Sequence, residues 1–287
     1  MMVQGSECSI VIKTTHCEMD VPYSEETIRE AVSFIQEEAS IEGIGVCGGI
    51  RINRGVIGCV VTPLTIYTVP LFLYLAMGSI GNPVYVSETR NVYRNNLNLL
   101  PMEDTESFDL IQDRGNERKL FEGCRAKGFE LRIMRGEAVK LKLDICGENP
   151  AVVFPFINNN EIKSEELFNC DSVTYKINNQ EYKNIYGMTL LTKKESGIKT
   201  ELLIKRVLEN TPDIPEIIDE MTITAQLTRT QYEQRFYGMF RITIKKLVFL
   251  SDETIVETAD AVIGPLRYYV TDSVFIEVFS SSEGFIP

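Results

Sequence analysis

The feature that most constrains this sequence is an alternation of apolar and polar residues that recurs from one end to the other. A period of two places the apolar side chains on one face of an extended chain, so each run predicts a strand with one buried face. Half-buried strands favour antiparallel sheets packed as a sandwich or barrel. The clearest runs are residues 9–13, 129–133, 139–145, 221–225, 240–245 and 274–279. The fold is therefore predicted to be mainly β.

Helical spacing is found near the N-terminus. Ser24 can cap a helix that carries Ile28, Val32 and Ile35 at helical intervals and ends at Gly43. This pattern predicts a helix that begins an arm of the molecule.

Two further helices are predicted. One follows Thr62 and Pro63 and contains the apolar residues 64–77, a stretch too short to span a bilayer and therefore expected to be a buried helix. The other runs from Thr228, which forms a capping box with Gln231, to about Gly238.

The two halves of the chain resemble each other. Residues 9–13 match 172–176, and Leu64 matches Leu227, both at an offset of 163, whereas residues 139–143 match 274–278 at an offset of 135. The difference predicts an insertion in the first half, at residues 79–105. We therefore predict a first domain at residues 1–150, a linker at 151–169 and a second domain at 170–287.

Composition excludes several classes of function. The formal net charge is −12, and no long basic run is present, so tight binding of duplex nucleic acid is not expected. The seven cysteines have irregular spacing and no C-x-x-C motif, which predicts reduced thiols in a reducing cytoplasm. The N-terminus has no signal-peptide pattern.

Catalytic and metal-binding patterns are missing as well. His16 is the only histidine, and it is expected at the surface rather than in a catalytic triad or a zinc site. Residues 43–48 match G-x-G-x-x-G but lack a strand before and a helix after, so they are interpreted as a loop or turn. The chain is predicted to be a non-enzymatic protein without a cofactor or a metal.

The order of these landmarks resembles the tail tube proteins of long-tailed bacteriophages. The resemblance rests on an early arm, on a glycine-flanked strand followed by an apolar helix, on a central hairpin and on a terminal strand pair. These lie at residues 21–28, at 49–58 with 64–78, at 107–111 with 121–131, and at 238–248 with 267–279. The arm at residues 25–39 and the insertion at 79–105 depart from the family pattern.

The resemblance implies two tandem tube domains, each a β-sandwich or barrel with a flanking helix and a long arm. It implies trimeric rings with pseudo-sixfold symmetry that stack into a tail tube. DNA passes through the tube without specific binding and without a reaction. The implied partners are other copies of the chain and the tape measure, terminator and baseplate proteins, with no membrane. The implied location is the virion tail, assembled in the bacterial host cytoplasm.

A tube needs arms that reach neighbouring subunits and a wall that does not hold DNA. Residues 25–53 and 193–220 are the candidate arms, and the acidic balance predicts a lumen rich in Asp and Glu. The candidate self-assembly residues on the arms are Ile28, Val32, Ile35, Leu203, Val207 and Ile214.

Three alternatives remain open. The first is another virion ring component, such as a tail terminator, baseplate hub or head-closure protein. The second is a β-sandwich binding module or adhesin, and the third is an enzyme.

Overall fold

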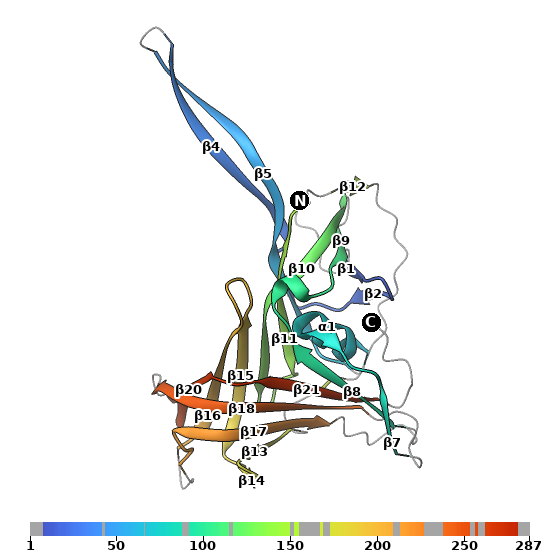
Figure 1. The fold of residues 1–287 in the computed structure, drawn as a ribbon, viewed down its shortest axis with the longest axis vertical. Coiled ribbons are helices and arrows are strands. Elements are labelled where there is room, and N and C mark those ends of the chain that lie inside the picture. Colours follow the sequence, from blue (N-terminus) through green and yellow to red (C-terminus); the bar gives the residue numbers. More distant parts are fainter. Residues whose placement is uncertain are drawn as a thin grey trace.

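The computed structural model describes residues 8–41, 44–65, 67–87, 92–114, 117–149, 152–154, 167–168, 173–208, 213–226, 238–252, 256–257 and 262–280. Antiparallel strands make up most of this part (Figure 1). The predicted mainly β fold is confirmed.

The elements of the first half begin with four strands and a very long fifth one. Their bounds are β1 (Cys8–Lys13), β2 (Glu18–Val21), β3 (Glu25–Glu26), β4 (Arg29–Ile41), β5 (Ile44–Pro63), α1 (Thr68–Met77), β6 (Gly78–Ile80), β7 (Val84–Ser87), β8 (Val92–Leu99), the short 3₁₀ helix Met102–Asp104, β9 (Phe108–Arg114), β10 (Glu117–Met134), β11 (Lys140–Gly147) and β12 (Val152–Phe154).

All the described elements of the second half are strands. They are β13 (Val173–Ile177), β14 (Gln180–Glu181), β15 (Ile185–Lys193), β16 (Lys199–Val207), β17 (Ile217–Gln226), β18 (Gly238–Asp252), β19 (Val256–Glu257), β20 (Val262–Val270) and β21 (Val274–Ser280).

The two halves have the same strand order. In the first half the order is β4, β5, β11, β10, β9, β1, β2, where each strand pairs with the next. In the second half it is β15, β16, β20, β18, β17, β13, β14. In both, a last strand, β12 or β21, pairs with the beginning of the long central strand, β10 or β18.

The correspondence extends to individual residues. The pairing of β10 with β11 shifts register between Ala126 and Gly128, and that of β18 with β20 shifts between Phe249 and Ser251. The two bulges are 123 positions apart (249 − 126 = 123). Gly123 has a φ of 67°, and Lys246, also 123 positions later, has a φ of 57°. The same kink is therefore built at the same place in both halves.

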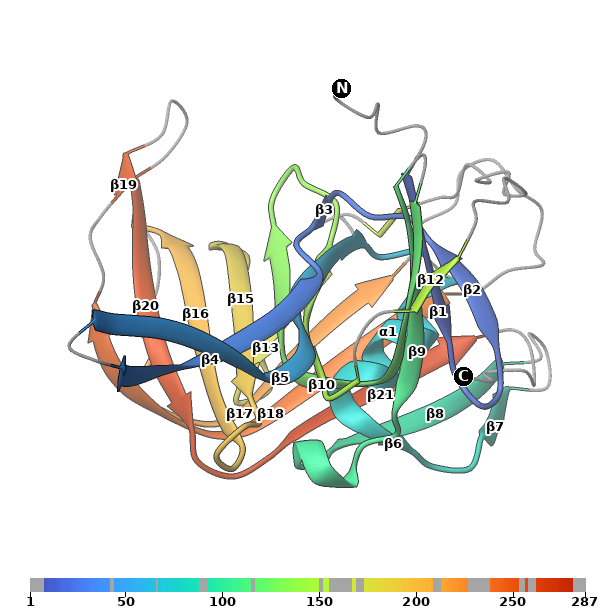
Figure 2. The same ribbon diagram turned by 90° about the horizontal axis from the view of Figure 1, so that it is seen from above.

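One insertion distinguishes the halves. In the first half α1, β6, β7 and β8 lie between β5 and β9, whereas in the second half residues 208–216 alone join β16 to β17. β8 does not remain with its own half, because it pairs with β21 (Figure 2). The insertion therefore extends the sheet of the second half.

α1 is buried on nearly all sides, because nine of its side chains are inaccessible to solvent. Thr65 and Thr68 exchange hydrogen bonds at its start: each backbone N–H donates to the other's hydroxyl, at 2.8 and 3.1 Å. Gly78, with a φ of 103°, ends the helix in the left-handed conformation. The apolar helix predicted at residues 64–77 is confirmed, although it begins at Thr68.

β4 and β5 form a hairpin that projects far from the rest of the molecule (Figure 1). Thirteen residue pairs join the two strands, from Arg29 opposite Ile57 to Ile41 opposite Ile44. At about 3.4 Å per residue, the part beyond Ala31 extends about 35 Å.

The helix predicted from Ser24 to Gly43 is therefore wrong. The spacing of Ile28, Val32 and Ile35 fits a helix, but β5 offers a complete ladder of backbone partners, and tertiary pairing prevails over local periodicity. The loop predicted at residues 43–48 is also wrong for Ile44 to Gly48, which belong to β5.

Other expectations have mixed outcomes. The insertion predicted at residues 79–105 contains strands and is longer than predicted, since it includes α1. The predicted match of β11 with β21 is wrong, because the pairings match β11 with β20. Leu227 and the helix predicted from Thr228 lie outside the described residues.

Candidate self-assembly surfaces

The described residues show no cluster of side chains suited to hold a metal ion: no three His, Cys, Asp or Glu side chains gather there. His16 is exposed in the turn between β1 and β2, where its backbone N–H donates to Thr14 Oγ1 at 3.2 Å. Burial raises the pKa of the Cys124 thiol to about 12, so this cysteine remains a protonated core residue.

The predicted assembly residues lie in several environments. Ile28 is buried in the core at the base of the hairpin, and Ile214 is buried beside β17. Val32 and Ile35 lie on β4, but their side chains are outside the part of the chain that the structure describes. The assembly role of these four residues stays a prediction.

The second predicted arm does not project. Leu203 and Val207 lie on β16, which is held between β15 and β20, and Leu203 is half-buried opposite Thr189 and Arg267. The long arm expected at residues 193–220 is therefore wrong for β16. The assembly role of Leu203 and Val207 stays a prediction.

The two halves are joined edge to edge by β10 and β15. We call this contact the internal seam. It comprises seven pairs, from Gly128 opposite Lys193 to Met134 opposite Gly187. In its middle Leu131 stands opposite Leu190, and both side chains are fully buried.

Close backbone approach requires glycine at both ends of the internal seam. A Cβ on Gly128 would lie 2.6 Å from the Thr192 carbonyl oxygen, and one on Gly187 would lie 2.6 Å from that of Ile133. The seam is thus a close backbone contact with buried leucines at its centre, between a strand of each half.

Each half also has an edge that corresponds to a side of the internal seam. β5 and β16 occupy the same place in the strand orders of the two halves. Glu26 pairs with Val60 of β5, and Met188 pairs with Ile204 of β16, so β3 and the start of β4 correspond to β15. Since β10 and β18 correspond at 123 positions, Ser251 and Asp252 correspond to the seam residues Gly128 and Phe129. We call these the N-edge (residues 25–31) and the C-edge (residues 251–252).

Polar side chains cover the backbone of the N-edge. The Ile28 N–H donates to Glu26 Oε1, and Gln112 Nε2 donates to the Ile28 carbonyl oxygen at 3.4 Å. Arg114 Nη2 donates to Glu26 Oε2 at 2.7 Å, although the Glu26 side chain is only 8% exposed. The three polar residues occupy places that Met188, Ile223 and Ala225 fill in the second half.

The C-edge is flanked by exposed apolar side chains. β17 pairs with β18 only as far as Ile217 opposite Val248, and Leu250 lies two residues further along β18. These three side chains are 66, 43 and 51% exposed. An exposed apolar cluster at the end of a strand is typical of a contact surface.

Two short edge strands are also apolar and exposed. All three residues of β12 are exposed, and so are Val84, Tyr85 and Val86 of β7. β12 corresponds to β21, whose outer side is covered by β8, and among the described residues β12 pairs with β10 alone.

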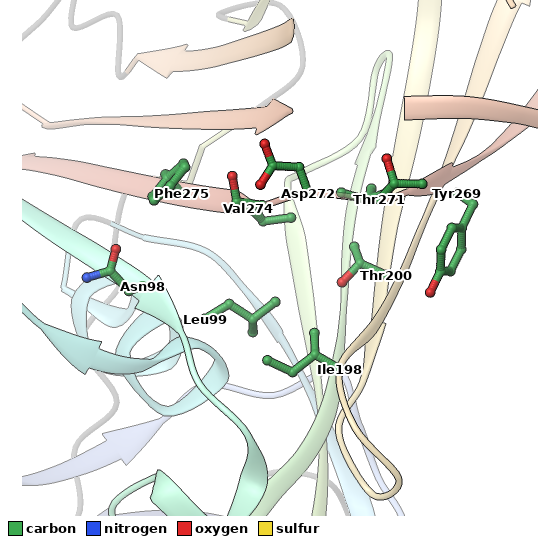
Figure 3. A pocket seen from close by; sticks show the side chains of 11 residues that line it. Asn98, Leu99, Ile198, Thr200, Tyr269, Thr271, Asp272, Val274 and Phe275 are labelled. Atoms are coloured by element: carbon green, nitrogen blue, oxygen red, sulfur yellow. The ribbon is translucent and has the colours of Figure 1, made fainter. Parts of the chain in front are cut away.

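A pocket of about 510 Å³ opens where β20 passes into β21 (Figure 3). Leu99, Ile198 and Phe275 provide apolar lining, and Thr200, Thr271 and Asp272 provide polar groups. The described residues that line it include no cluster of charges of the kind that would bind phosphate or a metal.

The insertion contacts both halves through polar groups. Tyr74 of α1 and Thr15 both donate to Glu106. Burial raises the pKa of Glu106, but these hydrogen bonds outweigh it, so the pKa is lowered overall. Lys194 Nζ donates to the carbonyl oxygen of Met77, at the end of α1, at 3.4 Å. Lys194 is 1% exposed, and burial lowers its pKa to about 8.

Comparison of the sequence with known protein families and with curated proteins finds no match. Within the described residues, no helix has both the length and the apolar character needed to cross a membrane.

Sequence reasoning missed the internal seam and the polar cover of the N-edge. Gly128 within an alternating strand was a usable signal for close backbone approach. Gln112 gave none, because its role depends on a strand 84 positions away.

Proposed function

We propose that this chain is a tail tube subunit of a long-tailed phage or of a phage-derived particle. In this proposal it consists of two tandem tube domains and assembles with copies of itself into stacked rings. The observation that carries the proposal is the repeated strand order, with the two halves joined edge to edge by the internal seam. A head-to-tail contact between like units can be repeated between chains, and it closes into a ring when the rotation allows.

The projecting hairpin supports stacking of rings. A two-stranded ribbon that extends about 35 Å from its sheet is too long to serve the fold of one chain. In the proposed tube it lies along subunits of the adjacent ring, where its backbone and side chains become buried.

The charge supports a conduit for DNA. Duplex DNA carries one negative charge per about 1.7 Å, so a basic wall would hold it at many phosphates. With a net charge of −12 per chain, we expect acids to outnumber bases on the strands that face the lumen. At physiological ionic strength this repulsion acts over about 8 Å and prevents adhesion to the wall.

Negative-stain electron microscopy of the purified protein tests the proposal. Uniform hollow tubes, with three chains per ring, are the expected result. Single rings that never stack favour a tail terminator, baseplate hub or head-closure protein. A protein that remains monomeric at all concentrations and salt conditions contradicts both assignments.

A further inference from the structure

One face of the sheet that crosses the internal seam is basic, although the chain as a whole has a net charge of −12. β11, β10, β15, β16 and β20 pair in this order and form one continuous sheet. Alternate side chains of these strands, such as Leu141, Leu131 and Leu202, are buried in the core, so the side chains between them lie on the opposite face. We call this opposite face the seam face. It contains the bases Arg132, Lys140, Lys142, Lys193, Lys199, Lys205 and Arg267 and the acids Glu130, Asp144 and Glu201.

Four lysines of the seam face have no acidic partner. Ion pairs join the other bases to acids, Lys142 to Asp144, Arg267 to Glu201 and Arg132 to Glu137. Within the described residues no ion pair includes Lys140, Lys193, Lys199 or Lys205. These four lysines lie on both sides of the internal seam, since Lys140 belongs to the first half and the other three belong to the second.

Two pairs of bases also stand directly opposite each other on neighbouring strands. Lys193 is opposite Lys199, and Lys140 is opposite Arg132. Like charges in this position weaken strand pairing, so the fold gains nothing from them. An anion bound across the seam face would supply the missing opposite charge.

We propose that the seam face binds the phosphate backbone of a nucleic acid, by charge and without reading the bases. This inference goes beyond the proposed function and does not depend on which strands line the tube. From β11 to β16 the face is about 15 Å wide, because neighbouring strands lie about 4.8 Å apart. A duplex carries one negative charge per about 1.7 Å of its axis, so a segment that crosses the face presents several phosphates to the lysines at once.

The composition of the seam face fits a nucleic acid better than a protein partner. Interfaces between proteins are depleted of lysine and have an apolar centre, whereas interfaces with nucleic acids are polar and strongly positive. Leu191 and Leu203 lie between the charged residues of the seam face, and both are half-buried. Flexible lysines suit contacts to phosphates, which carry no sequence information.

The expected binding is weak at the ionic strength of a cell. Four phosphate contacts give a slope of about −3.6 for log affinity against log salt, so the affinity falls by about 150-fold between 50 and 200 mM salt. The acids elsewhere on the chain repel DNA as well. Contacts of this strength are released quickly, so they do not obstruct the passage of DNA in the proposed tube.

Fluorescence anisotropy with labelled DNA duplexes of two unrelated sequences tests the proposal. The full-length chain is used at concentrations at which sedimentation velocity shows no assembly. The variant Lys193→Gln with Lys199→Gln should bind about tenfold more weakly at 50 mM salt and should reduce the salt slope by about 1.8, because two phosphate contacts are lost. Lys176→Gln with Lys183→Gln, at two exposed lysines outside the seam face, is the matched control for charge and should leave the slope unchanged.

The thermal midpoint of the seam-face variant should be no lower than that of the wild type, since the variant relieves the repulsion of Lys193 and Lys199. This measurement separates a loss of binding from a loss of fold. The wild type should bind the two duplex sequences equally.

Three outcomes overturn the proposal. They are the absence of DNA binding by the wild type at about 25 mM salt, equal losses in the two double variants, and a preference of more than about tenfold for one sequence. Binding of poly-glutamate without binding of DNA also overturns it and favours an acidic protein partner. Hollow tubes in the microscope would leave the proposed function standing in each of these cases.

Discussion

β10 and β18 are counterparts that share a bulge, a left-handed residue and the same neighbours on both sides. They differ in the residues that come after the bulge. In β10 the next seven residues pair with β15, whereas β18 ends at Asp252. The comparison teaches that the same backbone geometry is continued by a contact between the halves in β10 and by the end of the strand in β18.

The two hairpins at the edges show the same principle. β15 and β16 turn at residues 194–198, and at the corresponding place β4 and β5 continue outward. The short hairpin closes the internal seam, while the long one leaves the body of its own chain (Figure 1).

The largest expected effect comes from making the long hairpin as short as its counterpart. Removal of residues 32–54, with Ala31 joined to Gly55 through Asn-Gly, preserves the last pair at the base. Because no described core residue is removed, the thermal midpoint should change by only a few degrees. Tubes should be absent by electron microscopy. Tubes of normal length from the shortened chain would show that the hairpin does not join rings.

A second prediction breaks the internal seam. Leu131→Ala removes a fully buried side chain from the seam and should lower the free energy of unfolding by about 2–5 kcal/mol, measured by urea denaturation. Leu191→Ala, half-buried on β15 in the same seam, is the matched control and should cost less than half as much. Equal losses for the two variants would mean that the seam is not a packed core contact.

The third prediction concerns the turn of the short hairpin. Lys194 has a folded-state pKa of about 8, below its ordinary value of 10.5, so the unfolded chain binds more protons between these values. The free energy of unfolding should therefore rise as the pH rises from about 8 to about 10.5, by at most about 3.4 kcal/mol. Lys194→Met should remove this rise and stabilise the protein at pH 7. Lys193→Met, at an exposed neighbour, should leave the pH dependence intact.

Much of the β architecture can be predicted from the sequence, because alternation in strands such as β11 and β21 reports directly which face is buried. The apolar segment that forms α1 is equally clear in the sequence. The pairing partner of a strand is not clear in the sequence. β8 pairs with β21 of the other half, nearly 180 positions away, and no local sequence signal specifies this pairing. The long hairpin escapes prediction because Ile28, Val32 and Ile35 satisfy a helical period, while their pairing to β5 depends on residues beyond the turn.

The repeat itself is visible in the sequence only in outline. β1 and β13 are matched correctly as strands, but with few identities an alternating run can be aligned to the wrong neighbour, as with β11. The bulges before Gly128 and Ser251 show which residues of the two halves correspond. These bulges cannot be recognised in the sequence, because the residues that form them differ between the halves.

The last and smallest prediction uses the left-handed residue shared by the two halves. Lys246 has a φ of 57°, a conformation that costs a residue with a Cβ about 1 kcal/mol, whereas its counterpart Gly123 adopts a φ of 67° without that cost. The Thr271 N–H and hydroxyl both donate to the Lys246 carbonyl oxygen at 2.8 Å and hold the backbone in place. The Lys246 ammonium lies 3.2 Å from Asp219, but both groups are exposed and their ion pair contributes little to stability.

Lys246→Gly should therefore raise the free energy of unfolding by about 0.5–1 kcal/mol, and Gly123→Lys should lower it by at least as much. Lys176→Gly, at an exposed residue of β13 with negative φ, should destabilise, because glycine there only adds backbone freedom to the unfolded chain. If Lys246→Gly destabilised the protein as Lys176→Gly does, the kink in β18 would not be the equivalent of the kink in β10.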